Sequence, residues 1–215
     1  MTDPYYQDDH VTIYHGDCFD IIDSLAFDVI VTDPPYGIDV SAKREQQPGA
    51  TRWDDIYGDD TTDAASHLLD VIKSGDYPAG VFGANQFPEL LPHKGRWVCW
   101  DKRLTERADR MLGSAFELAW MNQRTGFDHM IRCLHGGVIN ANGRSRVHPT
   151  EKPVVVMRQL IELVGSAGVV LDPFAGSGTT LRAAKDLNRK AIGIEIEERY
   201  CEIAAKRCAQ EVLPI

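Results

Sequence analysis

The most distinctive chemistry lies in Asp33-Pro34-Pro35-Tyr36, which directly follows a largely apolar run at residues 27–32. A run rich in β-branched residues predicts a buried strand, and two prolines forbid its continuation as strand or helix. The chain must therefore leave the sheet at this point. This places a carboxylate, a proline carbonyl and an aromatic ring at the carboxyl end of a strand, where open α/β sheets bind their ligands.

These groups suit the activation of an exocyclic amine on a nucleobase, which is a poor nucleophile because its lone pair is delocalised into the ring. The Asp33 carboxylate and the Pro34 carbonyl could hold both amine hydrogens and draw the nitrogen towards an attacking geometry. Tyr36 could stack on a base taken out of the duplex. The alternative is a stiff turn with a satisfied carboxylate, and the tetrapeptide alone does not decide between the two.

A second candidate site is the glycine-rich turn after a predicted strand at residues 168–172. Gly176 and Gly178 let the backbone approach a ligand closely, and Glu195, at the end of the next predicted strand, suits the hydroxyls of a ribose. The turn lacks the third glycine of the dinucleotide fingerprint and the lysine of a phosphate-cradling loop. A nucleoside without a polyphosphate, such as S-adenosylmethionine, fits this pattern; the alternative is a tight turn with Glu195 solvated.

The elements that must position these residues alternate along the chain, which favours an α/β fold. Further strands are predicted at residues 11–15, 79–82, 97–102, 116–121 and 190–195, and helices at 18–25, 61–74, 86–91, 153–164, 179–188 and 197–211. Residues 1–10 are polar and acidic and predict a loosely held arm. The length of 215 residues and the absence of a convincing boundary predict a single domain over residues 1–215.

Two long polar stretches, at about residues 37–60 and 102–147, are predicted to be variable loops around this framework. Two irregular basic loops in one small chain suggest a surface that reads a substrate. Solvated loops or helix faces would explain the same composition. The candidate substrate contacts are Arg44, Lys102, Arg103 and Arg107.

The charge distribution also points to a local polyanion-facing surface. The whole chain has a formal net charge of −9, from 23 basic and 32 acidic residues. The segment from Lys94 to Lys152 holds 11 basic and 6 acidic residues, a net +5, which leaves 12 basic and 26 acidic residues, a net −14, elsewhere. Such a surface could face nucleic acid, although chance clustering would give a similar asymmetry.

Cysteine usage and hydropathy exclude several classes of protein. The 5 cysteines form no Cys-x-x-Cys pair and have no matching histidine spacing, so we expect reduced cysteines and no metal site. No signal-peptide pattern and no apolar run long enough to span a bilayer is found, so we expect a cytoplasmic protein without a membrane partner.

Three motifs together resemble the amino-methylating DNA methyltransferases of the β group, in which the catalytic motif precedes the cofactor motif. They are Asp33-Pro-Pro-Tyr36, His148-Pro-Thr-Glu-Lys-Pro153 and Asp172-Pro-Phe-Ala-Gly-Ser-Gly178. The resemblance implies a seven-stranded, mostly parallel methyltransferase sheet with helices on both faces, circularly permuted so that its first two strands come last. It also implies S-adenosylmethionine as cofactor and double-stranded DNA as substrate.

The resemblance assigns roles to particular positions. Asp33, Pro34, Pro35 and Tyr36 would form the catalytic motif that grips a flipped base. Glu195 would hold the ribose of the cofactor. The implied cofactor contacts are Asp17, which would approach the adenine, together with Thr150, Lys152, Asp172, Phe174, Gly176, Gly178 and Glu195.

Within this family an Asp before Pro-Pro-Tyr leans towards adenine N6 and a Ser towards cytosine N4, so Asp33 favours site-specific methylation of adenine N6. The alternatives are cytosine N4, an RNA or protein amide as acceptor, or a non-catalytic DNA-binding or regulatory protein on the same fold. An NAD-dependent dehydrogenase is disfavoured by the missing third glycine. A homodimer and a partner restriction endonuclease, as in restriction-modification, are compatible with the resemblance.

Overall fold

A computed structural model describes residues 3–35, 61–92, 94–103, 114–123, 126–134, 151–165 and 167–211. Its strands are β1 (Tyr6–Gln7), β2 (Val11–His15), β3 (Val29–Thr32), β4 (Ala79–Phe82), β5 (Arg96–Asp101), β6 (Phe116–Met121), β7 (His129–Arg132), β8 (Val170–Asp172) and β9 (Ala191–Glu195). Its helices are α1 (Cys18–Ile21), α3 (Asp63–Gly75), α4 (Val154–Val164), α5 (Thr179–Asp186) and α6 (Glu198–Cys208), with short 3₁₀ turns at Ile22–Ser24, Ala84–Gln86 and Pro88–Leu90.

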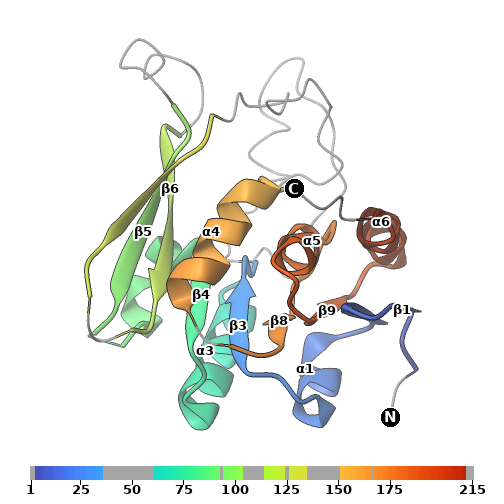
Figure 1. The fold of residues 1–215 in the computed structure, drawn as a ribbon. Coiled ribbons are helices and arrows are strands. Elements are labelled where there is room, and N and C mark those ends of the chain that lie inside the picture. Colours follow the sequence, from blue (N-terminus) through green and yellow to red (C-terminus); the bar gives the residue numbers. More distant parts are fainter. Residues whose placement is uncertain are drawn as a thin grey trace, which may run out of the picture.

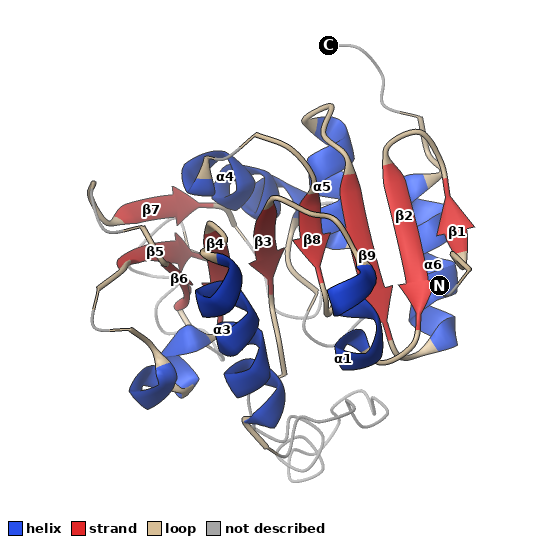
Figure 2. Cartoon of the chain, turned by 90° about the horizontal axis from the view of Figure 1, so that it is seen from below, coloured by secondary structure: helices blue, strands red, loops and turns tan. Residues whose placement is uncertain are grey.

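In the described part of the chain the strands form one 9-stranded sheet in the order β1-β2-β9-β8-β3-β4-β6-β5-β7 (Figures 1 and 2). The strands from β2 to β4 in this order are parallel neighbours, whereas β6 is antiparallel to both β4 and β5. Helices α4, α5 and α6 cover one face, and α1 and α3 cover the other (Figure 2). The predicted α/β sheet with helices on both faces is therefore confirmed.

The predicted count of seven strands is wrong, because each edge carries one strand more. Tyr6–Gln7, in the arm that we expected to be loose, pairs with β2, and His129–Arg132 pairs with β5 inside the stretch that we expected to be a loop. Of the four residues of β7 only Ile131 is buried. An edge strand with one buried side chain gives no alternating pattern, and this is why the sequence did not reveal it.

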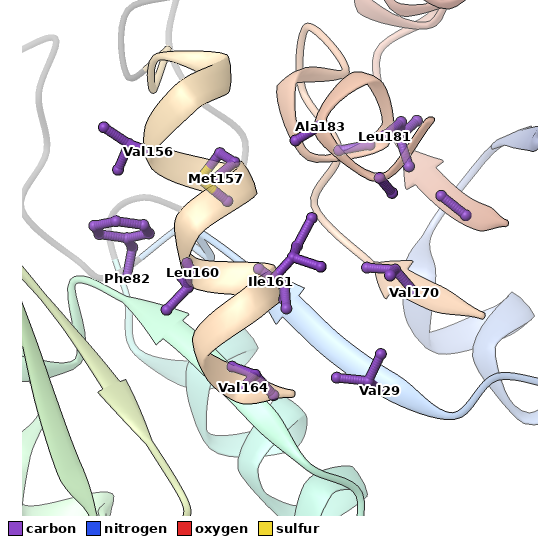
Figure 3. Packing of buried hydrophobic residues seen from close by; sticks show 14 of the residues in the cluster. Val29, Phe82, Val156, Met157, Leu160, Ile161, Val164, Val170, Leu181 and Ala183 are labelled. Atoms are coloured by element: carbon purple, nitrogen blue, oxygen red, sulfur yellow. The ribbon is translucent and has the colours of Figure 1, made fainter. Parts of the chain in front are cut away.

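Helix α4 shows how the sequence fixes the packing above the sheet. Its buried residues recur on one helical face and interlock with side chains of β3, β4 and β8 (Figure 3). Gly80 of β4 lies beneath this face, and a Cβ there would meet Val164 at 2.8 Å and Leu160 at 3.1 Å. The small residue thus lets α4 approach the sheet closely. The buried residues are Val156, Met157, Leu160, Ile161 and Val164.

The sheet has a topological switch point between β8 and β3, where the order in which successive strands are added reverses. The chain moves from β8 to β9 on one side and from β3 to β4 on the other, so β8 and β3 are adjacent parallel strands with opposite onward paths. Ligands of open α/β sheets bind outside the carboxyl ends of such a strand pair. The segments after β3 and β8 are the two motifs that the sequence singled out.

None of the described helices is both long and apolar enough to cross a membrane.

The packing of α4 makes a direct prediction about stability. Leu160 is fully buried, so Leu160→Ala should lower the free energy of unfolding by about 2–5 kcal/mol, through lost burial and the cavity left behind. Val155 on the same helix is 45% exposed, and Val155→Ala should change it by no more than about 0.5 kcal/mol. Urea denaturation of the two variants measures the contrast, and equal losses would contradict the packing described.

Candidate active site

Asp33 lies directly beyond the end of β3 and is held by a lysine from a distant part of the chain. Its Oδ2 accepts a hydrogen bond from Nζ of Lys152, and the two side chains are only 14% and 6% exposed. Pro34 is buried and Pro35 is half-buried, as expected for a rigid exit from the sheet. The fourth residue of the motif, Tyr36, lies outside the described residues. A buried ion pair of this kind fixes the position of the Asp33 carboxylate.

Asp172 ends the neighbouring strand β8 and is bonded back to β3. Its Oδ1 accepts hydrogen bonds from the Thr32 hydroxyl at 2.6 Å and from the Phe174 amide at 3.2 Å. The side chain is 3% exposed, and burial raises its pKa to about 6, against the effect of these hydrogen bonds and of one from Thr180. The nearby charge of Asp33 acts in the same direction as burial. Thr32 thus links the two motifs at the switch point of the sheet.

The glycine-rich turn folds over the carboxylate of Glu195 at the end of β9. The Gly176 amide donates to Oε2 and the Glu197 amide to Oε1, each at 2.8 Å. Burial raises the pKa of Glu195, whereas the two amides lower it. Each carboxylate oxygen can accept a second hydrogen bond. The group is therefore suited to bind hydroxyls, as the sequence predicted for a ribose.

Gly178 has a structural role that the sequence did not reveal. It has a φ of 77°, and a Cβ there would come within 2.7 Å of the Ala204 Cβ on α6. A side chain is therefore excluded by both the backbone conformation and the packing of α6. Contact of Gly178 with the cofactor stays a prediction.

Phe19, next to the capping residue Asp17, and Phe174 bring two turns together at the carboxyl edge. Asp17 caps α1 by accepting a hydrogen bond from the Phe19 amide at 2.9 Å. The Phe19 ring stacks on His67, with centroids 4.1 Å apart, and meets the Phe174 ring edge-on at 6.4 Å. The turn after β2 thus lies beside the turn after β8, which is the arrangement that a ligand spanning both turns requires.

The short segment before α4 contacts both motifs. Lys152 binds Asp33, whereas Glu151 forms an ion pair with Arg207 of α6. The Arg207 guanidinium also donates to the Ser177 hydroxyl at 3.2 Å and to the Thr179 hydroxyl. Arg207 thereby ties this segment to the glycine-rich turn. Sequence reasoning missed Arg207, because a basic residue in the last turn of an amphipathic helix reads as an ordinary surface residue.

The predicted substrate contacts are only partly placed. Lys102 is 13% exposed and pairs with Glu117, and Arg103 is 9% exposed. These observations do not decide whether Lys102 or Arg103 contacts DNA, so both roles stay predictions. The predicted contact of Lys152 with the cofactor stays a prediction as well. The other predicted site residues, Thr150, Arg44 and Arg107, lie outside the described residues.

The donor set fits the predicted cofactor. The acids Asp17, Asp172 and Glu195 lie at the carboxyl ends of β2, β8 and β9 or directly after them, and acids suit the hydroxyl and amino groups of a nucleoside better than a polyphosphate. Among the described residues no group of three His, Cys, Asp or Glu is placed to hold a metal ion. The cysteines are all free.

The raised pKa of Asp172 predicts a pH-dependent effect of Asp172→Asn on stability. The native carboxyl keeps its proton up to about pH 6, whereas an unfolded aspartate releases it near 3.8, so the wild type loses stability through this group as the pH rises between these values. The variant has no such loss. Relative to wild type, its free energy of unfolding should therefore rise by up to about 3 kcal/mol between about pH 4 and pH 7.

Denaturation of both proteins across this pH range provides the measurement. Asp70→Asn is the control, because the Asp70 side chain is 73% exposed and its replacement should give a nearly constant difference from wild type. A constant difference for Asp172→Asn as well would contradict the burial of an ionisable carboxyl at the end of β8.

Comparison with known proteins agrees with this geometry. A family model described as DNA methylase, whose name covers N6 and N4 methylation, matches residues 100–206. The protein "Putative methylase YubD" of Escherichia coli (strain K12) is 30% identical over 212 residues, which cover 90% of this chain and 88% of the relative.

Solved methyltransferase structures share the fold. The complex of M1.HpyAVI with S-adenosylmethionine matches with a TM-score of 0.56 and 23% identity, covering 93% of this chain and 100% of that one. The cytosine-N4-specific PvuII DNA methyltransferase matches with a TM-score of 0.60 and 15% identity, covering 99% and 91%. The two solved structures thus agree in fold, and the match to YubD, with the family model and the three motifs, establishes that the chain belongs to the β-group DNA amino-methyltransferases, which use S-adenosylmethionine as their cofactor.

Proposed function

We propose that this chain transfers a methyl group from S-adenosylmethionine to the N6 amine of an adenine flipped out of double-stranded DNA, at a specific sequence. The observation that carries the proposal is the adjacency of Asp33, at the end of β3, to the cofactor turn that begins at Asp172. The chain order, with β3 before β8, also supports a circularly permuted methyltransferase sheet.

The residues around Asp33 suggest how the amine is activated. When bound, the cofactor supplies an electrophilic methyl group on its sulfonium. The Asp33 carboxylate and the Pro34 carbonyl accept hydrogen bonds from the two N–H groups of the amine. The nitrogen lone pair thereby leaves conjugation with the ring and points at the methyl carbon. As the new nitrogen–carbon bond forms, the bond between the methyl carbon and sulfur would break and leave neutral S-adenosylhomocysteine, and the nitrogen would become cationic. The Asp33 carboxylate stabilises this charge and can take the proton that the nitrogen then loses.

The remaining residues bind and orient the reactants. Glu195 accepts hydrogen bonds from the ribose hydroxyls, and Asp17 approaches the cofactor adenine. Tyr36 stacks on the flipped base. Arg44, Lys102, Arg103 and Arg107 are proposed to contact the DNA. Homodimer formation and a partner restriction endonuclease stay predictions.

Adenine is preferred to cytosine because the motif begins with an aspartate. The specific alternative is cytosine N4, since the matched family covers both amines and the PvuII enzyme, of the same fold, is cytosine-N4-specific. Both reactions would use the same groups, so the two products must be told apart by analysis of the DNA.

The test is to incubate the protein with unmethylated DNA and S-adenosylmethionine, digest the DNA to nucleosides and identify modified bases by mass spectrometry. We expect N6-methyladenine, with no modified base when S-adenosylhomocysteine, which lacks the transferable methyl group, replaces the cofactor. N4-methylcytosine would refute the choice of base and keep the activity. The absence of any modified base, with cofactor binding demonstrated, would refute the activity on DNA.

A further inference from the structure

Four charged side chains of alternating sign run from the antiparallel side of the sheet to the catalytic motif. Lys102, just after β5, binds Oε1 of Glu117 on β6. Oε2 of Glu117 lies 3.2 Å from Nζ of Lys152, which in turn binds Oδ2 of Asp33. Only Asp33 and Lys152 belong to motifs found in the sequence. Glu117 links this ion pair to Lys102.

Glu117 is held in place through both of its carboxylate oxygens. It lies opposite Trp100 in the β5–β6 register, and its side chain is 31% exposed. Burial alone would raise its pKa, but the ammonium groups of Lys152 and Lys102 prevail and hold the pKa at about 2. Glu117 is therefore ionised throughout the neutral range and cannot exchange protons during a reaction near pH 7.

Glu117 modifies the electrostatic effect of the Lys152 ammonium group on the Asp33 carboxylate. Lys152 lies between two carboxylates, because its ammonium group contacts both Asp33 and Glu117. Its charge stabilises ionised Asp33, yet the same charge weakens a carboxylate as an acceptor for the target amine. The negative charge of Glu117 offsets part of this effect. Its hydrogen-bonding distance to Lys152 also restricts where the ammonium can sit.

We propose that Glu117 is a positioning residue for methyl transfer, which anchors Lys152 against Asp33 and preserves the strength of Asp33 as an acceptor for the target amine. This inference rests on the proposed function. Glu117 acts through Lys152, so it requires no contact with the base or the cofactor. The sequence did not single it out, because one acidic residue in an aromatic-rich strand carries no motif.

The test is Glu117→Gln, which keeps the shape of the side chain and removes its charge. We expect kcat to fall at least about tenfold, because a displaced or weakened catalytic group lowers the rate steeply. The acidic limb of the kcat–pH profile should move to lower pH, since loss of a nearby negative charge favours ionised Asp33. The dissociation constant of S-adenosylmethionine should stay within about twofold of wild type.

The matched control is Glu202→Gln, which removes a glutamate from an exposed ion pair with Lys206 on α6 and should change neither kcat nor the pH profile. Glu117→Asp restores the charge on a shorter side chain, so it should recover part of the rate and return the acidic limb towards wild type. If the Gln variant does not fold, the Asp variant carries the test. Its kcat should be lower than that of wild type, but by less than the tenfold expected for Glu117→Gln. A wild-type kcat and pH profile in either folded variant would overturn the inference, as would a loss of rate with no shift in Glu117→Gln.

A second readout needs no turnover. Carboxyl-carbon NMR titration should show Asp33 ionising at lower pH in Glu117→Gln than in wild type, and an unchanged titration would overturn the inference. If the wild-type protein methylates no DNA, the proposed function fails, while this titration still decides whether Glu117 controls the electrostatics of Asp33.

Discussion

The site depends on the parallel pairing of β3 with β8. The register places Val29 beside Val170 and Ile30 beside Leu171, so both strands end at the same edge of the sheet. The 2.6 Å hydrogen bond from Thr32 to Asp172 closes this contact between residues 140 positions apart in sequence. Two motifs that are distant along the chain thereby become the two halves of one site.

That pairing has an electrostatic consequence. It brings the carboxyls of Asp33 and Asp172 near each other in a region with little solvent, where like charges oppose ionisation. Lys152 compensates for this on the Asp33 side, and the hydroxyl of Thr32 does so on the Asp172 side. The result favours a charged Asp33 at neutral pH, which is the form needed to accept hydrogen bonds from an amine.

The division of roles along the carboxyl edge follows from the same topology. The glycine-rich turn after β8, which is the proposed cofactor site, and the acid at the end of β9 lie on one side of the switch point, and Asp33 lies on the other. The residues before α4 join the two halves, because Glu151 reaches the glycine-rich turn through Arg207 while Lys152 reaches Asp33. A methyl donor and an amine acceptor bound on opposite sides would meet at the pairing of β3 with β8.

The sequence predicted the parts of this arrangement that are local. Buried strands next to prolines or glycines, and an acid at a strand end, are recognisable from residue types and spacing alone, so Asp33 and Glu195 could be singled out as candidates, whereas Asp172 was implied by the family resemblance. Glu117 and Arg207 were not, because their roles arise only from tertiary contacts with the segment before α4. The edge strand β7 was missed for a related reason, since its side chains are mostly exposed and give no periodic signal.

The most direct test of the account compares methyl transfer and cofactor binding in Asp33→Ala and Asp33→Asn. Transfer of labelled methyl from S-adenosylmethionine to DNA should fall at least about 100-fold in both variants, because each lacks the preorganised carboxylate. Calorimetry on the same preparations should still show cofactor binding, since neither the glycine-rich turn after β8 nor Glu195 is changed. Methylation at the wild-type rate by either variant would contradict the role assigned to Asp33.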